Sequence, residues 1–234
     1  MNQYTAEWID TFLATIDPAQ TQREMAFLQR QLPRNRFTRV LDICCGLGRH
    51  SVALASIGYD VTGIDRDPAL IAQAKLVHSN ARFIAMDIKD LASLNGSFDA
   101  VICMWQSFGY LDSNGNEELL ASIASELGTG GRFVLDIYDR DFFEPRQGTL
   151  TTERAGKRIR ETKSMDGDRL LVELVYDEDE SRSDRFDWQI FTPTQIASLA
   201  GKHGLIVLTS CTGFDETKPP SGQSPRMQIV FEKV

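Results

Sequence analysis

The sequence predicts an α/β protein in which a parallel, doubly wound sheet carries a small antiparallel β insertion. Between Pro33 and about residue 139, apolar strand-like segments alternate with helical patterns, which is typical of βαβ units. From about 149 to 191 the pattern changes to that of antiparallel strands joined by short turns. The length of 234 residues suits one large domain or one domain with an insertion.

The N-terminal segment, 1–35, is expected to form helices. Apolar residues recur at helical spacing through 3–31, and Asp17-Pro18 separates two helical segments. The main α/β core is then assigned to 36–144 and 192–234, and the antiparallel insertion to 145–191.

The core elements follow in alternation. Strands are expected at 39–43, 60–64, 82–85, 99–104 and 131–136, and helices at 49–57, 68–78 and 116–127. In the insertion, Asp166-Gly167-Asp168 indicates a hairpin between two strands. A helix with Pro193 near its start should end at Gly204, and two last strands, LIVLTS and MQIVFEKV, complete the chain.

Charge and composition narrow the class of partner. The chain has 25 basic and 33 acidic residues, a net charge of −8, and therefore lacks the basic surplus typical of nucleic-acid or anionic-membrane binding. No apolar run approaches a membrane span, and the first residues lack the pattern of a signal peptide. We expect a soluble, cytoplasmic protein; nothing in the sequence indicates an oligomeric state.

The four cysteines do not indicate a metal or redox site. Cys44 and Cys45 are adjacent, Cys103 and Cys211 stand alone, and no CxxC pair exists. We expect small buried thiols and no metal centre.

The stretch VLDICCGLGRHS, at 40–51, predicts a ligand site. A strand that ends in a glycine loop and a helix start forms a crevice at the carboxyl edge of a parallel sheet. A dinucleotide loop of the GxGxxG type fits only in part, because Ser51 stands where the last glycine belongs. Asp65, at the end of the second strand, is suited to bind a ribose, whether the ligand is a dinucleotide or another adenosyl compound. Asp42 favours a cationic ligand, since a carboxylate before the loop would repel a pyrophosphate.

VLDICCGLGRH resembles the first motif of the class I S-adenosylmethionine-dependent methyltransferases. GIDRDPALI, RFIAMDIKDL, FDAVICMWQSFGYL and GGRFVLDIYD resemble the following motifs, in order, through roughly 36–139. The resemblance implies a Rossmann-like methyltransferase fold, a seven-stranded, mostly parallel sheet with helices on both faces and an antiparallel last strand. It also implies S-adenosylmethionine as cofactor and S-adenosylhomocysteine as product.

The resemblance assigns cofactor-binding roles by position. Asp65 would bind the ribose hydroxyls, and Cys44 would replace the first of three loop glycines. The full set comprises Asp42, Cys44, Gly46, Gly48, Asp65, Arg66, Asp87, Ile88, Met104 and Trp105. Arg66, Asp87 and Ile88 would surround the adenine, and Met104 and Trp105 would border cofactor and substrate. The N-terminal helices, with Tyr4 and Trp8, would form either a lid or ordinary core packing.

The acceptor side offers fewer signals. The loop after the fourth strand lacks the Asp/Asn-Pro-Pro-Tyr/Phe sequence of amino-group methylation on nucleobases, and has aromatic residues instead. The substrate candidates are Trp105, Tyr110, Tyr138 and Arg226, with the insertion as a cover. Asp136, Asp139 and Asp141 suit either a Mg²⁺ site or helix caps and solvated groups. His50 suits either a base or helix packing.

These observations give one leading hypothesis and three alternatives. The protein is expected to transfer a methyl group from S-adenosylmethionine to N, O or C of a small molecule by in-line displacement. Because such transfer depends mainly on orientation, no catalytic residue is assigned. The alternatives are a methyltransferase acting on a protein or on RNA, an NAD-dependent oxidoreductase, and a cofactor-binding regulatory or assembly protein. The acidic charge balance argues against RNA more than against protein.

Overall fold

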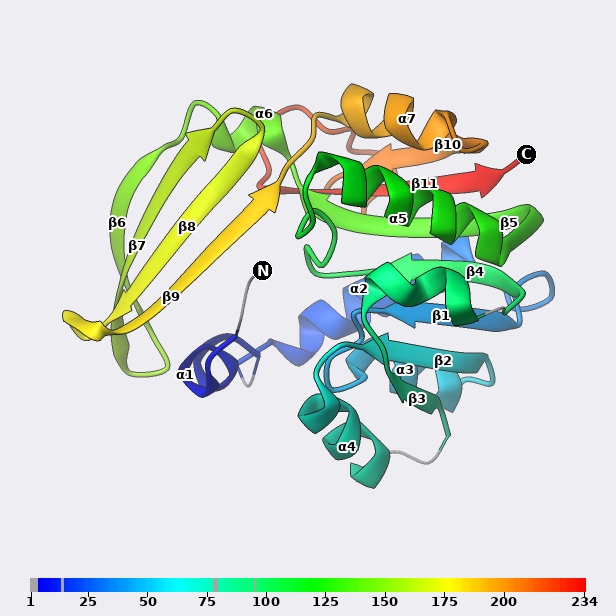
Figure 1. Cartoon of the computed structure of the whole chain (residues 1–234), viewed down its shortest axis with the longest axis horizontal. Helices are drawn as coiled ribbons and strands as arrows, with labels where there is room; N and C mark the ends of the chain where they lie inside the picture. Colours follow the sequence, from blue (N-terminus) through cyan, green and yellow to red (C-terminus); the bar gives the residue numbers. More distant parts are fainter. Residues whose placement is uncertain (1–3, 14, 78–79, 95) are drawn as a thin grey trace.

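The chain folds around two β-sheets (Figure 1). The computed structural model describes residues 4–13, 15–77, 80–94 and 96–234. The larger sheet has the strand order β10-β11-β5-β4-β1-β2-β3. Its strands are β1 Arg39–Ile43, β2 Asp60–Asp65, β3 Arg82–Ala85, β4 Phe98–Cys103, β5 Leu127–Tyr138, β10 Leu205–Cys211 and β11 Arg226–Lys233.

All strands of this sheet run in one direction except β11, which is antiparallel to both of its neighbours, β5 and β10. The parallel strands therefore end at one edge, where their connections to the helices lie together. The predicted fold class, a mostly parallel seven-stranded sheet with a reversed last strand, is confirmed.

Helices cover both faces of the sheet. On one face, α5 (Ser113–Glu126), α7 (Pro193–Gly201) and a 3₁₀ helix (Ile88–Leu94) pack on alternate residues of the strands. On the other face, α2 (Pro18–Gln31) and α3 (Arg49–Ser56) pack on the remaining alternate residues. This alternation explains the continuous apolar strands, because residues on both faces are buried.

The remaining helices lie at the edges. Helix α4 (Pro68–Val77) packs beside β3, and α6 (Arg140–Phe143) follows β5. The expected helical segments 3–31 and 68–78 include Gln3, Ala14 and His78, which lie outside the described residues. None of the described helices is both long and apolar enough to cross a bilayer.

The N-terminal helices are interrupted where the sequence indicates a break. A short helix, α1 (Ala6–Trp8), continues into a π-helical segment at Ile9–Leu13. Helix α2 then starts afresh, because the Asp17 side chain accepts a hydrogen bond from the Ala19 amide and Pro18 occupies the first turn.

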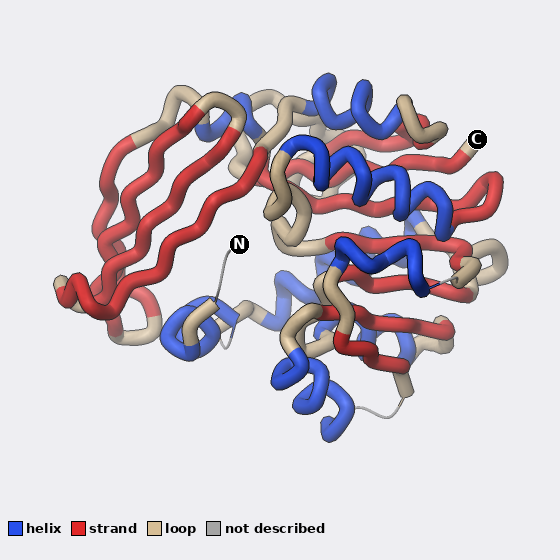
Figure 2. Tube along the Cα trace, in the orientation of Figure 1, coloured by secondary structure: helices blue, strands red, loops and turns tan. Residues whose placement is uncertain are grey.

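The second sheet is antiparallel, with strands β6 (Gly148–Arg154), β7 (Lys157–Asp166), β8 (Arg169–Tyr176) and β9 (Asp179–Gln189) in sequential order (Figure 2). Its inner face has an apolar core of its own. The buried members are Phe143, Ile159, Leu170, Val172, Leu174, Tyr176, Phe186, Trp188 and Ile190. Tyr4, Trp8 and Phe12 of the N-terminal segment pack against this core rather than against the larger sheet.

Gly109 joins the two sheets through backbone contact. It lies in the loop after β4, and its carbonyl accepts a hydrogen bond of 2.8 Å from the Gln189 amide at the end of β9. Its φ is +102°, and a Cβ at this position would collide with the Gln189 carbonyl oxygen. Only glycine satisfies both conditions.

We therefore expect Gly109→Ala to lower the free energy of unfolding by about 2–5 kcal/mol, from backbone strain and overpacking together. Gly130→Ala is the matched control: Gly130 also has a positive φ, +79°, but open space beside its α-carbon. The control should lose only about 1–2 kcal/mol. Urea denaturation measures both, and equal losses would contradict the close approach of the two sheets.

Candidate functional site

The loop between β1 and α3 lies at the carboxyl edge of the larger sheet. Its turn is closed by hydrogen bonds of 2.9 Å from the Cys45 amide to the Ile64 carbonyl and from the Gly48 amide to the Cys45 carbonyl. Cys44, Gly46 and Gly48 all have positive φ values, of 58°, 54° and 80°. Cys44 thus adopts a conformation that glycine prefers, which agrees with its place in the first glycine position.

Glycine is needed at the two positions of this loop for different reasons. A Cβ on Gly48 would lie 2.6 Å from the Phe83 ring, so Gly48 allows α3 to pack against the sheet. A Cβ on Gly46 would meet nothing within 4 Å, so the backbone at Gly46 borders open space. Gly46 is therefore the part of the loop that a ligand can approach closely.

Asp65 is tied directly to the loop. It ends β2, and its Oδ2 accepts a hydrogen bond of 2.9 Å from the Gly46 amide. Its Oδ1 accepts one of 3.0 Å from the Asp67 amide. Each carboxylate oxygen retains capacity for a further donor, since a carboxylate offers about four acceptor positions.

Asp42 lies beneath the loop rather than facing the crevice. Its side chain is almost fully buried, and Oδ2 accepts a hydrogen bond of 2.6 Å from the Ser51 hydroxyl. Burial raises the pKa of Asp42, against the opposing effects of His50 and Ser51. The carboxylate therefore joins the end of β1 to the start of α3, and acts on a ligand only through space.

The other three residues expected around an adenine lie beyond β2 and β3. Arg66 follows β2 and is exposed. Asp87 is half-buried and accepts a hydrogen bond of 3.0 Å from the Lys89 amide. Ile88 begins the 3₁₀ helix and is 8% exposed.

The loop after β4 contains a strained pair. Trp105 and Gln106 both have left-handed φ values, of 63° and 57°, although neither is a residue that favours this conformation. Asp136 holds the pair in this conformation. Its Oδ2 accepts a hydrogen bond from the Trp105 amide, and its backbone carbonyl accepts one from the Gln106 amide, each of 2.9 Å. Strain of this kind gathers at functional sites. Met104, just before the pair, lies with its side chain in the core beneath the crevice and is 3% exposed.

Asp136 also holds Arg226. The Arg226 guanidinium pairs with the Asp136 carboxylate, and Gln228 donates a hydrogen bond of 2.8 Å to the same carboxylate. Burial lowers the pKa of Arg226 to about 10, which leaves it charged at neutral pH. Arg226 lies against one side of Trp105, with Cζ 5.7 Å from the ring centroid, and Arg49 is 5.5 Å from the same centroid.

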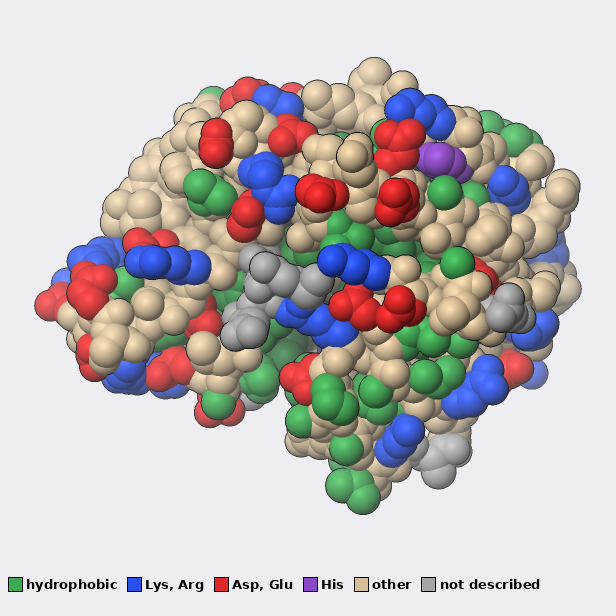
Figure 3. Space-filling model, viewed as in Figure 1, with side chains coloured by type: hydrophobic (Ala, Val, Ile, Leu, Met, Phe, Trp, Pro, Cys, Tyr) green, Lys and Arg blue, Asp and Glu red, His purple; other side chains and the backbone are tan. Residues whose placement is uncertain are grey.

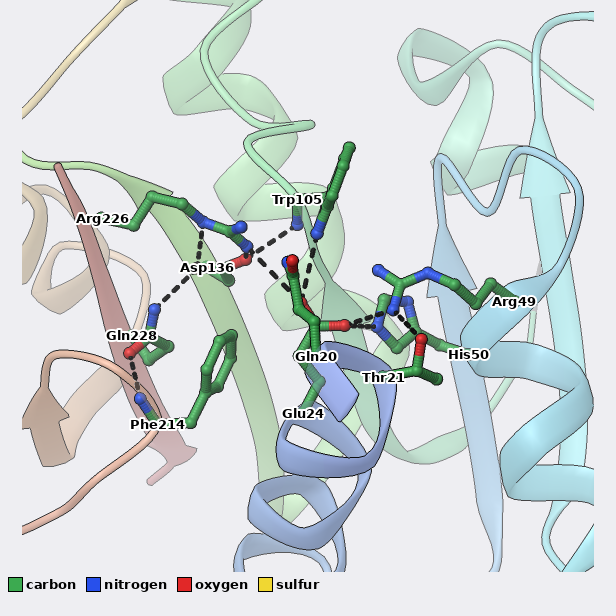
Figure 4. A network of polar contacts seen from close by, with 10 residues as sticks. All are labelled: Gln20, Thr21, Glu24, Arg49, His50, Trp105, Asp136, Phe214, Arg226 and Gln228. Atoms are coloured by element: carbon green, nitrogen blue, oxygen red, sulfur yellow. Dashed lines mark hydrogen bonds and ion pairs between the residues drawn. The ribbon is translucent and has the colours of Figure 1, made fainter. Parts of the chain in front are cut away.

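Glu24 of α2 connects this loop to the glycine loop (Figure 4). Its Oε1 accepts a hydrogen bond of 3.1 Å from the Trp105 indole nitrogen. Its Oε2 pairs with Arg49 and lies 2.9 Å from His50 Nε2. Arg226 Nη2 lies 4.0 Å from Oε1. His50, a candidate base in the sequence, is thereby placed in a structural network.

The Glu24 carboxylate is fully buried and ionised. Burial by itself raises the pKa, but hydrogen bonding and charge attraction from His50, with the charge of Arg49, outweigh it and hold the pKa of Glu24 at about 2. Sequence reasoning missed this residue. A usable signal exists: Glu24, Leu28 and Gln31 lie on one buried face of α2, where a carboxylate requires partners.

The aromatic substrate candidates lie where the two sheets meet. Tyr138, at the end of β5, packs edge-on against Phe143 and Trp188, with centroids 4.8 and 5.5 Å away. The Tyr110 hydroxyl is hydrogen-bonded to that of Tyr4. Figure 3 shows this face hollowed between the sheets, with hydrophobic side chains in the hollow. The structure thus brings Tyr110 and Tyr138 together beneath the insertion, while Trp105 and Arg226 lie toward the glycine loop.

The acids considered for Mg²⁺ have other partners. Asp136 is bound to Arg226, and Asp139 caps α6 by accepting from the Asp141 amide at 3.0 Å. No group of three His, Cys, Asp or Glu side chains arranged for a metal occurs among the residues that the structure describes.

Comparisons with known proteins agree with this architecture. Residues 40–131 match the family model of a methyltransferase domain. The glycine/sarcosine N-methyltransferase of Halorhodospira halochloris is 29% identical over 152 residues, which cover 58% of this chain and 54% of the relative. The human (Homo sapiens) glycine N-methyltransferase is 31% identical over 137 residues, 50% of this chain and 46% of the relative. The matches thus span about half the length of these relatives.

Solved structures match over nearly the whole chain. A methyltransferase from Clostridium acetobutylicum, described as S-adenosylmethionine-dependent, has a TM-score of 0.78 at 17% identity and 97% coverage of both chains. CalS10, an amino pentose methyltransferase from Micromonospora echinaspora, solved with S-adenosylmethionine, has a TM-score of 0.71 at 18% identity, covering 100% of this chain and 99% of its own. At these identities the likeness shows the fold. Residues 40–131 are thus similar to a methyltransferase domain, and the whole chain has the fold of solved S-adenosylmethionine-dependent methyltransferases.

Proposed function

We propose that this protein is an enzyme that transfers a methyl group from S-adenosylmethionine to a small-molecule acceptor. The observation that carries the proposal is the coupling of the glycine loop to the acid of β2, through the Gly46 amide and Asp65 Oδ2. This places a backbone open to a ligand beside a carboxylate with free acceptor capacity, at the carboxyl edge of a parallel sheet.

The residues present fit this cofactor. Asp65 would accept hydrogen bonds from ribose hydroxyls, and Gly46 leaves room for the ligand beside the loop. Arg66, Asp87 and Ile88 would surround the adenine, and Asp42, which accepts a hydrogen bond from Ser51, would hold the start of α3 beneath the loop. When bound, the cofactor supplies an electrophilic methyl group on a sulfonium.

This chain's own contribution is orientation. Methyl transfer forms one bond to the acceptor lone pair and breaks the bond between sulfur and carbon, whose electrons stay on sulfur. It needs the two reacting atoms about 3–3.5 Å apart and in line. Trp105 and Gln106 supply a rigid wall for this alignment, because Asp136 accepts hydrogen bonds from both backbone amides and Glu24 accepts one from the Trp105 indole.

The acceptor side is aromatic. Burial raises the pKa of Tyr110 and of Tyr138, so both phenols stay protonated at neutral pH and serve as hydrogen-bond donors rather than bases. Arg226, beside Trp105, would hold a carboxylate of the cofactor or acceptor. Relatives named for glycine, sarcosine and an amino pentose support a small-molecule acceptor.

The antiparallel insertion and the N-terminal segment would together cover the acceptor. Glu7 of α1 pairs with Lys157 and Arg182 of the insertion, at 2.5 and 2.6 Å. Thr5 hydrogen-bonds to the buried Asp184 of β9. The N-terminal segment is therefore attached to the insertion by charge, and we propose that it serves as a lid.

Asp65→Asn is expected to weaken binding of S-adenosylmethionine and S-adenosylhomocysteine by about 10- to 150-fold, because it removes charge-assisted bonds worth roughly 1.5–3 kcal/mol. Isothermal titration calorimetry measures both ligands. Asp60→Asn, at the opposite end of the same strand, is the matched control and should bind as the wild type does. Unchanged affinity in Asp65→Asn would remove Asp65 from the cofactor site.

Methyl transfer itself is tested by incubating the protein with S-adenosylmethionine carrying a labelled methyl group and a metabolite extract. Label is expected in the low-molecular-weight fraction. Label in protein would instead indicate a protein acceptor. The unfolding temperature measured with NAD and with S-adenosylmethionine distinguishes an oxidoreductase from a methyltransferase, because a ligand stabilises the protein that binds it. Stabilisation by NAD alone would contradict the proposal.

Glu24→Gln is expected to lower stability in a pH-dependent way. Because the folded pKa of about 2 lies below the unfolded value of about 4.5, the charge stabilises the fold fully above pH 4.5 and the effect disappears as pH falls toward 2. The difference from the wild type at neutral pH should be on the order of 3 kcal/mol. Urea denaturation between pH 2.5 and 7 measures it, and a difference independent of pH would contradict an ionised Glu24. Glu118→Gln on α5, an exposed position, should change stability by less than about 0.5 kcal/mol.

A further inference from the structure

Two neighbouring charged side chains of β7, Glu161 and Lys163, lie on the mostly apolar inner face of the antiparallel sheet. Ile159, Glu161, Lys163 and Met165 alternate along β7, and of these Ile159 and Met165 belong to or pack on the apolar core. Glu161 lies opposite buried Leu174, and Lys163 opposite buried Val172. The other charges on this face have partners in the N-terminal segment, since Lys157 pairs with Glu7 and Asp184 accepts a hydrogen bond from Thr5. Glu161 and Lys163 pair with each other instead.

The pair has little structural value where it stands. Lys163 Nζ donates to Glu161 Oε2 at 2.6 Å, and both side chains are 27% exposed. A partly exposed ion pair contributes at most about 1 kcal/mol to the free energy of unfolding, and apolar residues can commonly replace such a pair without loss of stability. On the outer face, by contrast, Arg160 pairs with Glu180 where both side chains remain exposed to solvent, so neither charge loses its hydration.

The pair adjoins the hollow between the sheets. Lys163 Nζ lies 5.7 Å from the centroid of Phe143, whose ring packs against Tyr138. Glu161 is paired with Lys163 and therefore lies on the same side of the sheet as Phe143. Its charge, after burial, also raises the pKa of Tyr138. Tyr138 is the last residue of β5, two residues beyond Asp136, which fixes Trp105.

We propose that Glu161 and Lys163 recognise the acceptor, and that the acceptor is a small zwitterion with an amine and a carboxylate or phosphate. Lys163 binds the anionic group, and Glu161 accepts hydrogen bonds from the amine. A zwitterion replaces the internal ion pair by two new pairs, so no charge is left uncompensated on this face.

This inference rests on the proposed methyl transfer, and the experiment separates the two. Wild-type protein is incubated with S-adenosylmethionine and a metabolite extract, and methylated small products are identified by mass spectrometry. The expected product carries both an amine and an anionic group. A neutral product, a product with only one of these groups, or a protein product would overturn the inference while methyl transfer stands. Binding of S-adenosylhomocysteine without any methylated product would overturn both.

Variants then test the residues. With the identified acceptor, Lys163→Met should raise KM at least tenfold. In the wild type, an acceptor analogue without the anionic group should have a higher KM than the acceptor, and in Lys163→Met the two KM values should be similar. Glu161→Gln should raise KM similarly for the amine. Arg160→Met, on the outer face of the same strand, is the matched control and should leave KM unchanged. The Kd for S-adenosylhomocysteine should stay at the wild-type value in all three, which shows an intact fold. A Lys163→Met enzyme with wild-type KM would overturn the assignment.

Discussion

The buried carboxylate of Glu24 is the interaction on which the geometry of the crevice depends. A fully buried carboxylate without partners would cost several kcal/mol, so its surroundings must supply donors. Here they come from α3, from the loop after β4 and, at longer range, from β11. One side chain of an N-terminal helix thus fixes the relative positions of the loops that border the proposed cofactor and acceptor.

The left-handed pair at Trp105 and Gln106 belongs to the same arrangement. Its backbone is stable only because Asp136 accepts both amides, and Asp136 is balanced in turn by Arg226. Charges are therefore matched in pairs around the crevice, Glu24 with Arg49 and Asp136 with Arg226. A ligand meets a polar site that is already organised, so little of its binding energy is spent on ordering side chains.

The sequence is sufficient to predict the fold, because its signals are local. Strands β1 and β3 were expected at 39–43 and 82–85, where the structure has them, since their apolar runs end at clear turn residues. The family motifs name both Gly46 and Asp65 as cofactor-binding residues, and the structure adds the hydrogen bond between them. Glu24 escapes this reasoning, since its partners lie up to about two hundred positions away in the chain. The conformation of Trp105 escapes it too, because no residue preference indicates a positive φ there. Asp42 was expected among the cofactor-binding residues, and only the tertiary structure shows that its carboxylate accepts a hydrogen bond from Ser51.

The antiparallel sheet has its own apolar core, distinct from the two cores of the larger sheet. Substitutions at well-separated sites without shared partners have nearly additive effects on stability. Changes on the inner face of β7 are therefore expected to leave the glycine loop and its energetics almost untouched. The division into separate cores would make the proposed acceptor side of the molecule an independently evolvable module, in which mutation could change the substrate while the proposed cofactor side retained its affinity.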